Sequence, residues 1–167
     1  MKRGGPDLRK EMGDIGYLES HPEVCQLFKD AGCYRFCEKI QGSHQQVAEA
    51  FALTFDDTKA VINKEKFQVD EAFIAEVTEL PRTGENWFKT TVTKNVEFRS
   101  YLKPKHKSIV WKKSIHMSYL EEKWQHLLKS ILVYITYEGR YNRVMIYNFK
   151  LMNHFTSRIP LNIPFYL

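Results

Sequence analysis

Residues 118–136 read SYLEEKWQHLLKSILVYIT and form the most regular apolar pattern in the chain. Their apolar side chains recur every three or four positions, at Leu120, Trp124, Leu127, Leu128, Ile131, Leu132 and Ile135. This spacing predicts one amphipathic helix with a single buried face. Ser118 and Glu121 match a capping box at its start, and Gly139 predicts its end.

A second helix is expected directly after this one. Asn142 is a suitable N-cap, and apolar residues follow it at helical spacing: Val144, Tyr147, Leu151 and Phe155. We expect Trp124 to be largely buried against this helix. Residues 162–164 are typical of a further helix start, and only three residues follow them, so we expect the chain to be truncated at its C-terminus.

The N-terminal half also predicts helices. Pro22 suits the first turn of a helix that Gly32 ends, and a second helix is expected over 34–40. Ser43 is expected to cap a third helix and Asp70 a fourth, which stops before Pro81. Between the last two, residues 60–62 and 67–69 favour strands. They predict a hairpin turning at Asn63, which tolerates a positive φ.

Two regions lack clear periodicity. Residues 1–19 carry few large apolar side chains, so we expect a flexible N-terminal arm. Within 81–117, residues 90–93 and 109–111 favour strand, so a further short strand is expected inside 90–111. The sequence thus predicts a mainly α chain: one compact helical domain over 20–167 with one short β-hairpin.

Composition narrows the cellular setting. The chain has 167 residues, of which 43% are hydrophobic and 14% aromatic, enough for a packed core. No secretory signal and no run of about 20 apolar residues is visible, which predicts an intracellular protein that does not span a membrane. The choice between nucleus and cytoplasm stays open. The net charge of +5 permits contact with nucleic acid or an acidic partner without requiring it.

The order of these elements resembles a known family. Residues 47–80 pair a helix, a hairpin and a capped helix, and residues 124–167 pair a tryptophan-bearing helix with a second helix across the turn at 140–144. This arrangement is similar to the plant transposon protein domain, found in uncharacterised plant proteins and retroelement-derived reading frames. The resemblance implies no catalytic residues and no transposase chemistry. The sequence departs from the family at Asn63 and Lys64, where a glycine is usual.

Metal binding is the first chemistry to consider. Weak candidate ligands are Cys25, Cys33, Cys37 and His21, because zinc favours cysteine and histidine. No Cys-x-x-Cys pair is present, however, and eight positions separate Cys25 from Cys33. We favour the alternative that these are reduced thiols packed beside Phe28, and we expect neither metal nor cofactor.

Nucleic-acid binding is the second. The basic segment, residues 103–113, holds one aromatic among several cations: Lys103, Lys105, Lys107, Trp111, Lys112 and Lys113. Lysines can neutralise phosphates while an exposed tryptophan stacks on a base. The alternative, which we favour, is a solvated surface with Trp111 turned into the core.

Enzymatic chemistry is the third. No P-loop, nucleophile elbow or zinc-protease motif is present. Turns, caps or exposed helix faces account for the carboxylates of Asp56, Asp57, Asp70, Glu76 and Glu79. We therefore predict a transposon-derived binding or assembly module that acts through protein–protein contacts, including self-association. The alternatives are weak, non-specific nucleic-acid binding through the basic segment and an enzyme of unknown class.

Overall fold

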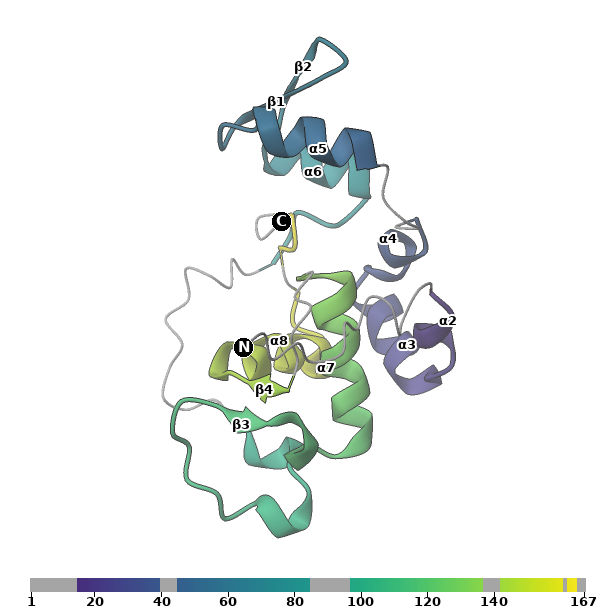
Figure 1. Cartoon of the computed structure of the whole chain (residues 1–167). Coiled ribbons are helices and arrows are strands. Elements are labelled where there is room, and N and C mark those ends of the chain that lie inside the picture. The colour runs from purple at the N-terminus through teal and green to yellow at the C-terminus, as the bar shows by residue number, and fades with distance from the viewer. Residues whose placement is uncertain (1–14, 40–44, 85–96, 137–141, 161, 165–167) are drawn as a thin grey trace.

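The computed structural model describes residues 15–39, 45–84, 97–136, 142–160 and 162–164. Helices dominate these residues, and the described strands form two small antiparallel pairs (Figure 1), which confirms the mainly α prediction. The α-helices are α2 (Gly16–Glu19), α3 (Pro22–Asp30), α4 (Tyr34–Lys39), α5 (Gln45–Thr54), α6 (Glu71–Thr78), α7 (Glu122–Tyr134) and α8 (Ile146–Ser157). The strands are β1 (Lys59–Ile62), β2 (Glu65–Gln68), β3 (Ile115–His116) and β4 (Arg143–Val144). Three 3₁₀ turns precede α7: η1 (Arg99–Tyr101), η2 (Pro104–His106) and η3 (Met117–Tyr119).

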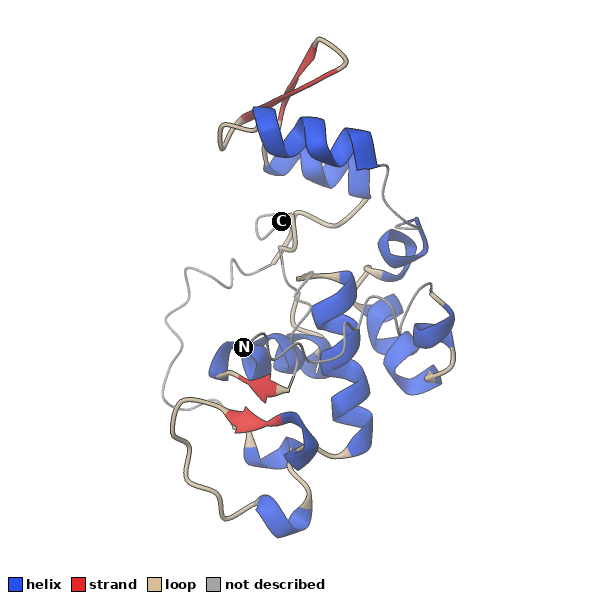
Figure 2. Cartoon of the chain, in the orientation of Figure 1, coloured by secondary structure: helices blue, strands red, loops and turns tan. Residues whose placement is uncertain are grey.

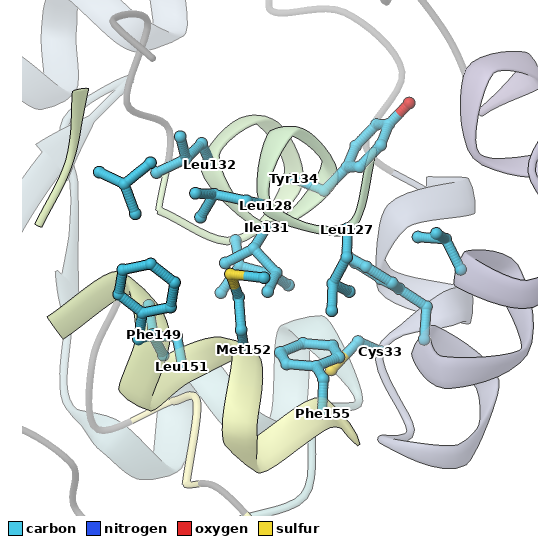
Figure 3. Close-up of a cluster of buried hydrophobic side chains, with 14 of the residues drawn as sticks. Cys33, Leu127, Leu128, Ile131, Leu132, Tyr134, Phe149, Leu151, Met152 and Phe155 are labelled. Atoms are coloured by element: carbon cyan, nitrogen blue, oxygen red, sulfur yellow. The ribbon is translucent and has the colours of Figure 1, made fainter. Parts of the chain in front are cut away.

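The core lies where α3, α7 and α8 meet. The predicted apolar face of α7 supplies much of it, because Leu127, Leu128 and Ile131 are fully buried. Figure 3 shows these side chains facing Met152 and Phe155 of α8 across the centre of the cluster. Burial of this continuous stripe is what fixes α7 against its neighbours.

The starts of α7 and α8 differ from those predicted. Residues 117–119 form η3, and the N–H of Ser118 donates to Nδ1 of His116 at 3.2 Å, so α7 begins only at Glu122. The prediction of a capping box at Ser118 is therefore wrong. Asn142 does not cap α8 either, because the helix starts at Ile146 and its first turn is closed by the Met145 N–H donating to Asn148.

Two tryptophans show how the middle of the chain packs. Trp124 is half-buried rather than largely buried, and its ring meets Tyr101 of η1 edge-on at 5.2 Å. The helical stripe predicted an apolar neighbour for Trp124, but that neighbour comes from the aperiodic region before α7. Trp111 is also half-buried, with its ring 5.2 Å from Phe98 and 5.8 Å from Phe149, so it does turn toward the core.

The second strand pair lies outside the predicted strands. β3 and β4 pair through Ile115 with Val144 and through His116 with Arg143. Residues 109–111 form no strand, contrary to the prediction, since the chain leaves η2 in irregular conformation before it reaches β3. Residues 90–93 lie outside the described part.

The N-terminal helices agree with their predicted signals. Pro22 occupies the first turn of α3, and Gly32 follows its end with a φ of +72°. A side chain at Gly32 would be strained in that conformation, and its Cβ would touch the ring of Pro81 at 3.6 Å. Leu18 of α2 is buried in the core, so the described end of the predicted arm packs on the domain. Ser43 lies outside the described residues.

The predicted hairpin joins α5 to α6. Ala60 faces Phe67 across β1 and β2, and the turn residues Asn63 and Lys64 have φ values of +52° and +70°. Asp70 caps α6 by accepting the Phe73 N–H at 2.8 Å, as predicted. Figure 2 shows α5, α6 and the hairpin together at one end of the molecule. We call residues 45–78 the α5–α6 lobe. In the part of the chain that is described, no helix has the length and apolarity needed to cross a membrane.

Candidate interaction surface

The α5–α6 lobe buries very little of itself. Of its described side chains, Ala60 alone is buried. The rest of the molecule contrasts with this, because α3, α7 and α8 each contribute fully buried residues to one core. A helix pair and a hairpin that bury one alanine lack the apolar burial that normally stabilises such elements. The described chain therefore leaves the lobe without the packing partner that such elements normally have.

Large apolar side chains on the lobe face solvent instead. The exposed fraction is 86% for Leu53 and 60% for Val77, and Val47, Phe51 and Phe55 are also exposed. The rings of Phe51 and Phe55, which directly follows α5, stack on each other at 4.9 Å, and Val47 lies one helical turn before Phe51. We call Val47, Phe51 and Phe55 the apolar face; Leu53, two positions from Phe51, lies on the opposite side of α5. Grouped exposure of this kind marks interaction sites, whereas single exposed apolar residues do not.

Polar contacts hold the lobe to the rest of the chain. Lys39 at the end of α4 forms an ion pair with Glu79, and this pair lowers the pKa of the Glu79 carboxyl. Nδ2 of Asn162 donates to Oε1 of Glu71 at 2.7 Å. Leu80, just after α6, is buried in the core. These contacts anchor the base of the lobe near α4 and the 162–164 segment and leave its apolar face uncovered.

The basic segment lies at the other end of the molecule (Figure 1). Lys105, Lys107, Lys112 and Lys113 are exposed, and Lys103 is half-buried. The structure does not gather all of them at one point. Lys112 alone among them lines a hollow of about 400 Å³, which His116, Tyr119 and Arg143 also line.

Arg143 was not among the residues predicted to bind. It lies in β4, far from the basic segment in sequence, and reaches it because β4 pairs with β3. Nη1 of Arg143 lies 3.3 Å from Oγ of Ser114, which holds the guanidinium beside the hollow. Two-residue strands have no periodic signature, so no pattern in the sequence could have identified this neighbour.

The weak metal candidates separate into two groups. Cys25, Cys33 and Cys37 are buried thiols, and burial raises the pKa of Cys33 to about 12 and that of Cys37 further. His21 points elsewhere, because its ring packs at a tilt against that of His126 of α7, with the ring centres 3.8 Å apart. Among the described residues, no cluster of three histidine, cysteine or acidic side chains could hold a metal ion. Their burial in the core cluster fits the interpretation that these cysteines pack against apolar neighbours.

Three of the carboxylates have structural partners in the described residues. Asp56 accepts the N–H groups of Thr58 and Lys59, which lowers the pKa of its carboxyl. Asp70 caps α6, and Glu79 pairs with Lys39. Asp56 and Glu79 are therefore held ionised by local contacts, without any arrangement that would poise them for proton transfer. The prediction that the chain is not an enzyme stays a prediction.

A second hollow, of about 260 Å³, lies beside the C-terminal ends of α3 and α8. Asp30 and Arg158 form an ion pair of 3.2 Å at its wall, so their charges offset each other. The apolar part of the wall includes Phe155 and Ile163. This hollow offers no uncompensated charge that would select a ligand.

Comparison with known proteins returns no relatives: no family model matches the chain, and neither curated proteins nor solved structures contain a match. The resemblance to the plant transposon protein domain stays a prediction.

Proposed function

We propose that this chain is an assembly module whose apolar face binds the same face of a second copy. The observation that supports this is the contrast within one chain. The α5–α6 lobe buries only Ala60 among its described side chains, yet it exposes Val47 and the stacked pair Phe51 and Phe55. Covering this face would remove apolar surface from water, which is the main driving force of association.

A second copy suits this face because the face carries little charge. Helix α5 has one charged residue, Glu49, among its ten positions. Two identical surfaces that meet across a two-fold axis place each residue against the partner's copy of the same patch, so charged patches repel and apolar ones do not. Two helices from each copy would form a four-helix arrangement, a common way to bury such faces.

The size of the face sets the expected strength. The ten-residue α5 is about 15 Å long, and two neighbouring helices about 10 Å wide present on the order of 300 Å². Stable interfaces bury about 800 Å² on each partner. We therefore expect a weak dimer that forms with rising concentration rather than a permanent one.

Sedimentation equilibrium across a concentration series tests the proposal. The weight-average mass of the wild-type chain should rise toward that of a dimer. Phe51→Asp should keep the chain monomeric, because an unpaired charge buried in an apolar interface costs far more than the same charge on the exposed surface of the monomer. Val110→Asp is the matched control, since Val110 is 76% exposed but lies in the basic segment.

Two results would contradict the proposal. One is a wild-type chain that stays monomeric at every concentration. The other is a Val110→Asp chain that loses self-association as fully as Phe51→Asp, because that would place the contact outside the apolar face. Circular dichroism should show that both variants stay folded, since both side chains are exposed.

A further inference from the structure

The hollow beside β3 and β4 concentrates positive charge from two distant parts of the sequence. Lys112 comes from the segment before β3, and Arg143 comes from β4. Because His116 pairs with Arg143 in the strand register, both side chains belong to one short stretch of sheet. The remaining wall is formed by Ile109, Val110, Ser114, Ile115 and Tyr119, so no described acidic side chain lines the hollow.

The cations of the hollow are not neutralised by the described part of the protein. The described ion pairs involve Lys39, Arg82, His126 and Arg158, and none involves Lys112 or Arg143. Within the described residues, the Arg143 guanidinium donates one hydrogen bond, to the neutral hydroxyl of Ser114 at 3.3 Å. Since a guanidinium offers five donors in a planar fork, most of its hydrogen-bonding capacity remains available to a ligand.

His116 adds a hydrogen-bond donor to the hollow, the Nε2–H group of its ring. Its Nδ1 accepts the Ser118 N–H at 3.2 Å and lies 2.7 Å from the Ser118 hydroxyl. In the neutral ring, an Nδ1 that accepts a backbone N–H carries no proton, so the proton sits on Nε2. His116 therefore presents an N–H donor without having to become charged.

Positive charge continues beyond the hollow along η2. Tyr119, which lines the hollow, accepts the Lys103 N–H on its carbonyl at 2.9 Å and stacks its ring on His106 at 4.1 Å. Burial lowers the pKa of His106, and the charges of Lys105 and Lys103 lower it further. The hollow and η2 thus form one basic surface with several separate cations rather than a single isolated site.

We propose that this hollow binds a backbone phosphate of a nucleic-acid strand, with Arg143 and Lys112 as the phosphate contacts and Lys103 and Lys105 meeting neighbouring phosphates. A guanidinium fork matches the paired oxygens of a phosphate, and Lys112 adds a point charge. Separated cations favour a polyanion with repeated charges over a single phosphorylated side chain. This inference is independent of the apolar face, because it uses a different end of the molecule.

Fluorescence anisotropy with a labelled single strand of mixed sequence, measured across a salt series, tests the site. Arg143→Gln and Lys112→Gln should each weaken binding. Each should also reduce the slope of log affinity against log salt by about 0.7, the value for one lost phosphate contact on a single strand. The matched control is the double variant Lys64→Gln and Lys66→Gln. It removes two exposed lysines from the hairpin at the opposite end and lowers the net charge by more than either single variant.

The control decides between a site and a general charge effect. If the hollow is the site, the hairpin variant keeps the wild-type slope while Arg143→Gln does not. Equal losses in both would overturn the proposal, as would a wild-type chain that binds no strand at low salt. Lys112 is exposed, so its replacement leaves folding intact and keeps the test valid if Arg143→Gln lowers the melting temperature.

Nuclear magnetic resonance gives a second, positional readout. Titration of the strand should shift backbone amide signals of residues 112–119 and 143–144 and leave those of the hairpin at 59–68 unchanged. A phosphoserine peptide added at equal total charge should displace the strand poorly. Shifts confined to other residues, or full displacement by the peptide, would contradict a nucleic-acid site in this hollow.

Discussion

Replacing Phe28 by alanine tests whether the junction of α3, α7 and α8 is the structural centre of the chain. The Phe28 side chain is fully buried. Its ring lies 5.0 Å from that of Phe155 on α8 and meets Tyr134 of α7 edge-on at 6.3 Å. Because these two partners come from different helices, loss of the ring removes contacts that tie α3 to both.

The size of the effect follows from this burial. Truncation of a buried phenylalanine costs about 3–5 kcal/mol, and the cost rises when the surroundings cannot collapse into the cavity. Three helices enclose Phe28, so we expect a loss of about 4 kcal/mol in the free energy of unfolding. For a chain of this length, that loss lowers the melting temperature by about 8–16 °C.

Urea unfolding followed by circular dichroism measures the change directly. Leu53→Ala is the control, because Leu53 is 86% exposed in the α5–α6 lobe and its truncation should alter stability by less than about 0.5 kcal/mol. A loss below about 1 kcal/mol for Phe28→Ala, or an equal loss for the control, would refute the assignment of the core.

Three further results are expected. Trp124→Ala should cost about 2 kcal/mol, less than Phe28→Ala, because the indole is only half-buried; equal urea midpoints for the two variants would contradict this. Burial and the neighbouring His21 lower the pKa of His126, so the folded state takes up this proton less readily than the unfolded chain. Its contribution to stability is therefore lost as the pH falls below about 6.5, and His126→Gln should flatten the dependence of melting temperature on pH. Iodoacetamide at mildly alkaline pH should leave Cys33 and Cys37 unmodified in the folded chain and alkylate both in urea, as mass spectrometry would show.

Local signals in the sequence predicted local structure well. The stripe of α7, the hairpin with its turn at Asn63 and the cap at Asp70 each depend on residues within a few positions of one another. Ser118 shows where this logic stops. Its spacing to Glu121 fits a capping box, but β3 and η3 take up the backbone before α7 can begin. A competing local structure cannot be seen in the spacing alone.

The sequence could not predict contacts between distant segments, because spacing along the chain does not show which segments meet. Tyr101 packs on Trp124, and Arg143 joins Lys112 at the hollow, through a 3₁₀ turn and a strand pair too short for any periodic pattern. The apolar face is a different case. The sequence spaces Val47, Phe51 and Phe55 four positions apart but does not say whether the protein covers them, and their exposure shows that the described chain does not.

The α5–α6 lobe lies at one end of the molecule and β3 toward the other, with α7 and α8 between them (Figure 1). A dimer formed through the α5–α6 lobes would leave the hollow of each copy open, because the pairing surface is the end remote from β3 and β4. The two proposals therefore need not compete for the same surface. A substitution that abolished both self-association and strand binding would indicate damage to the core, since the charged side chains of the hollow and the residues of the apolar face are not among its buried residues.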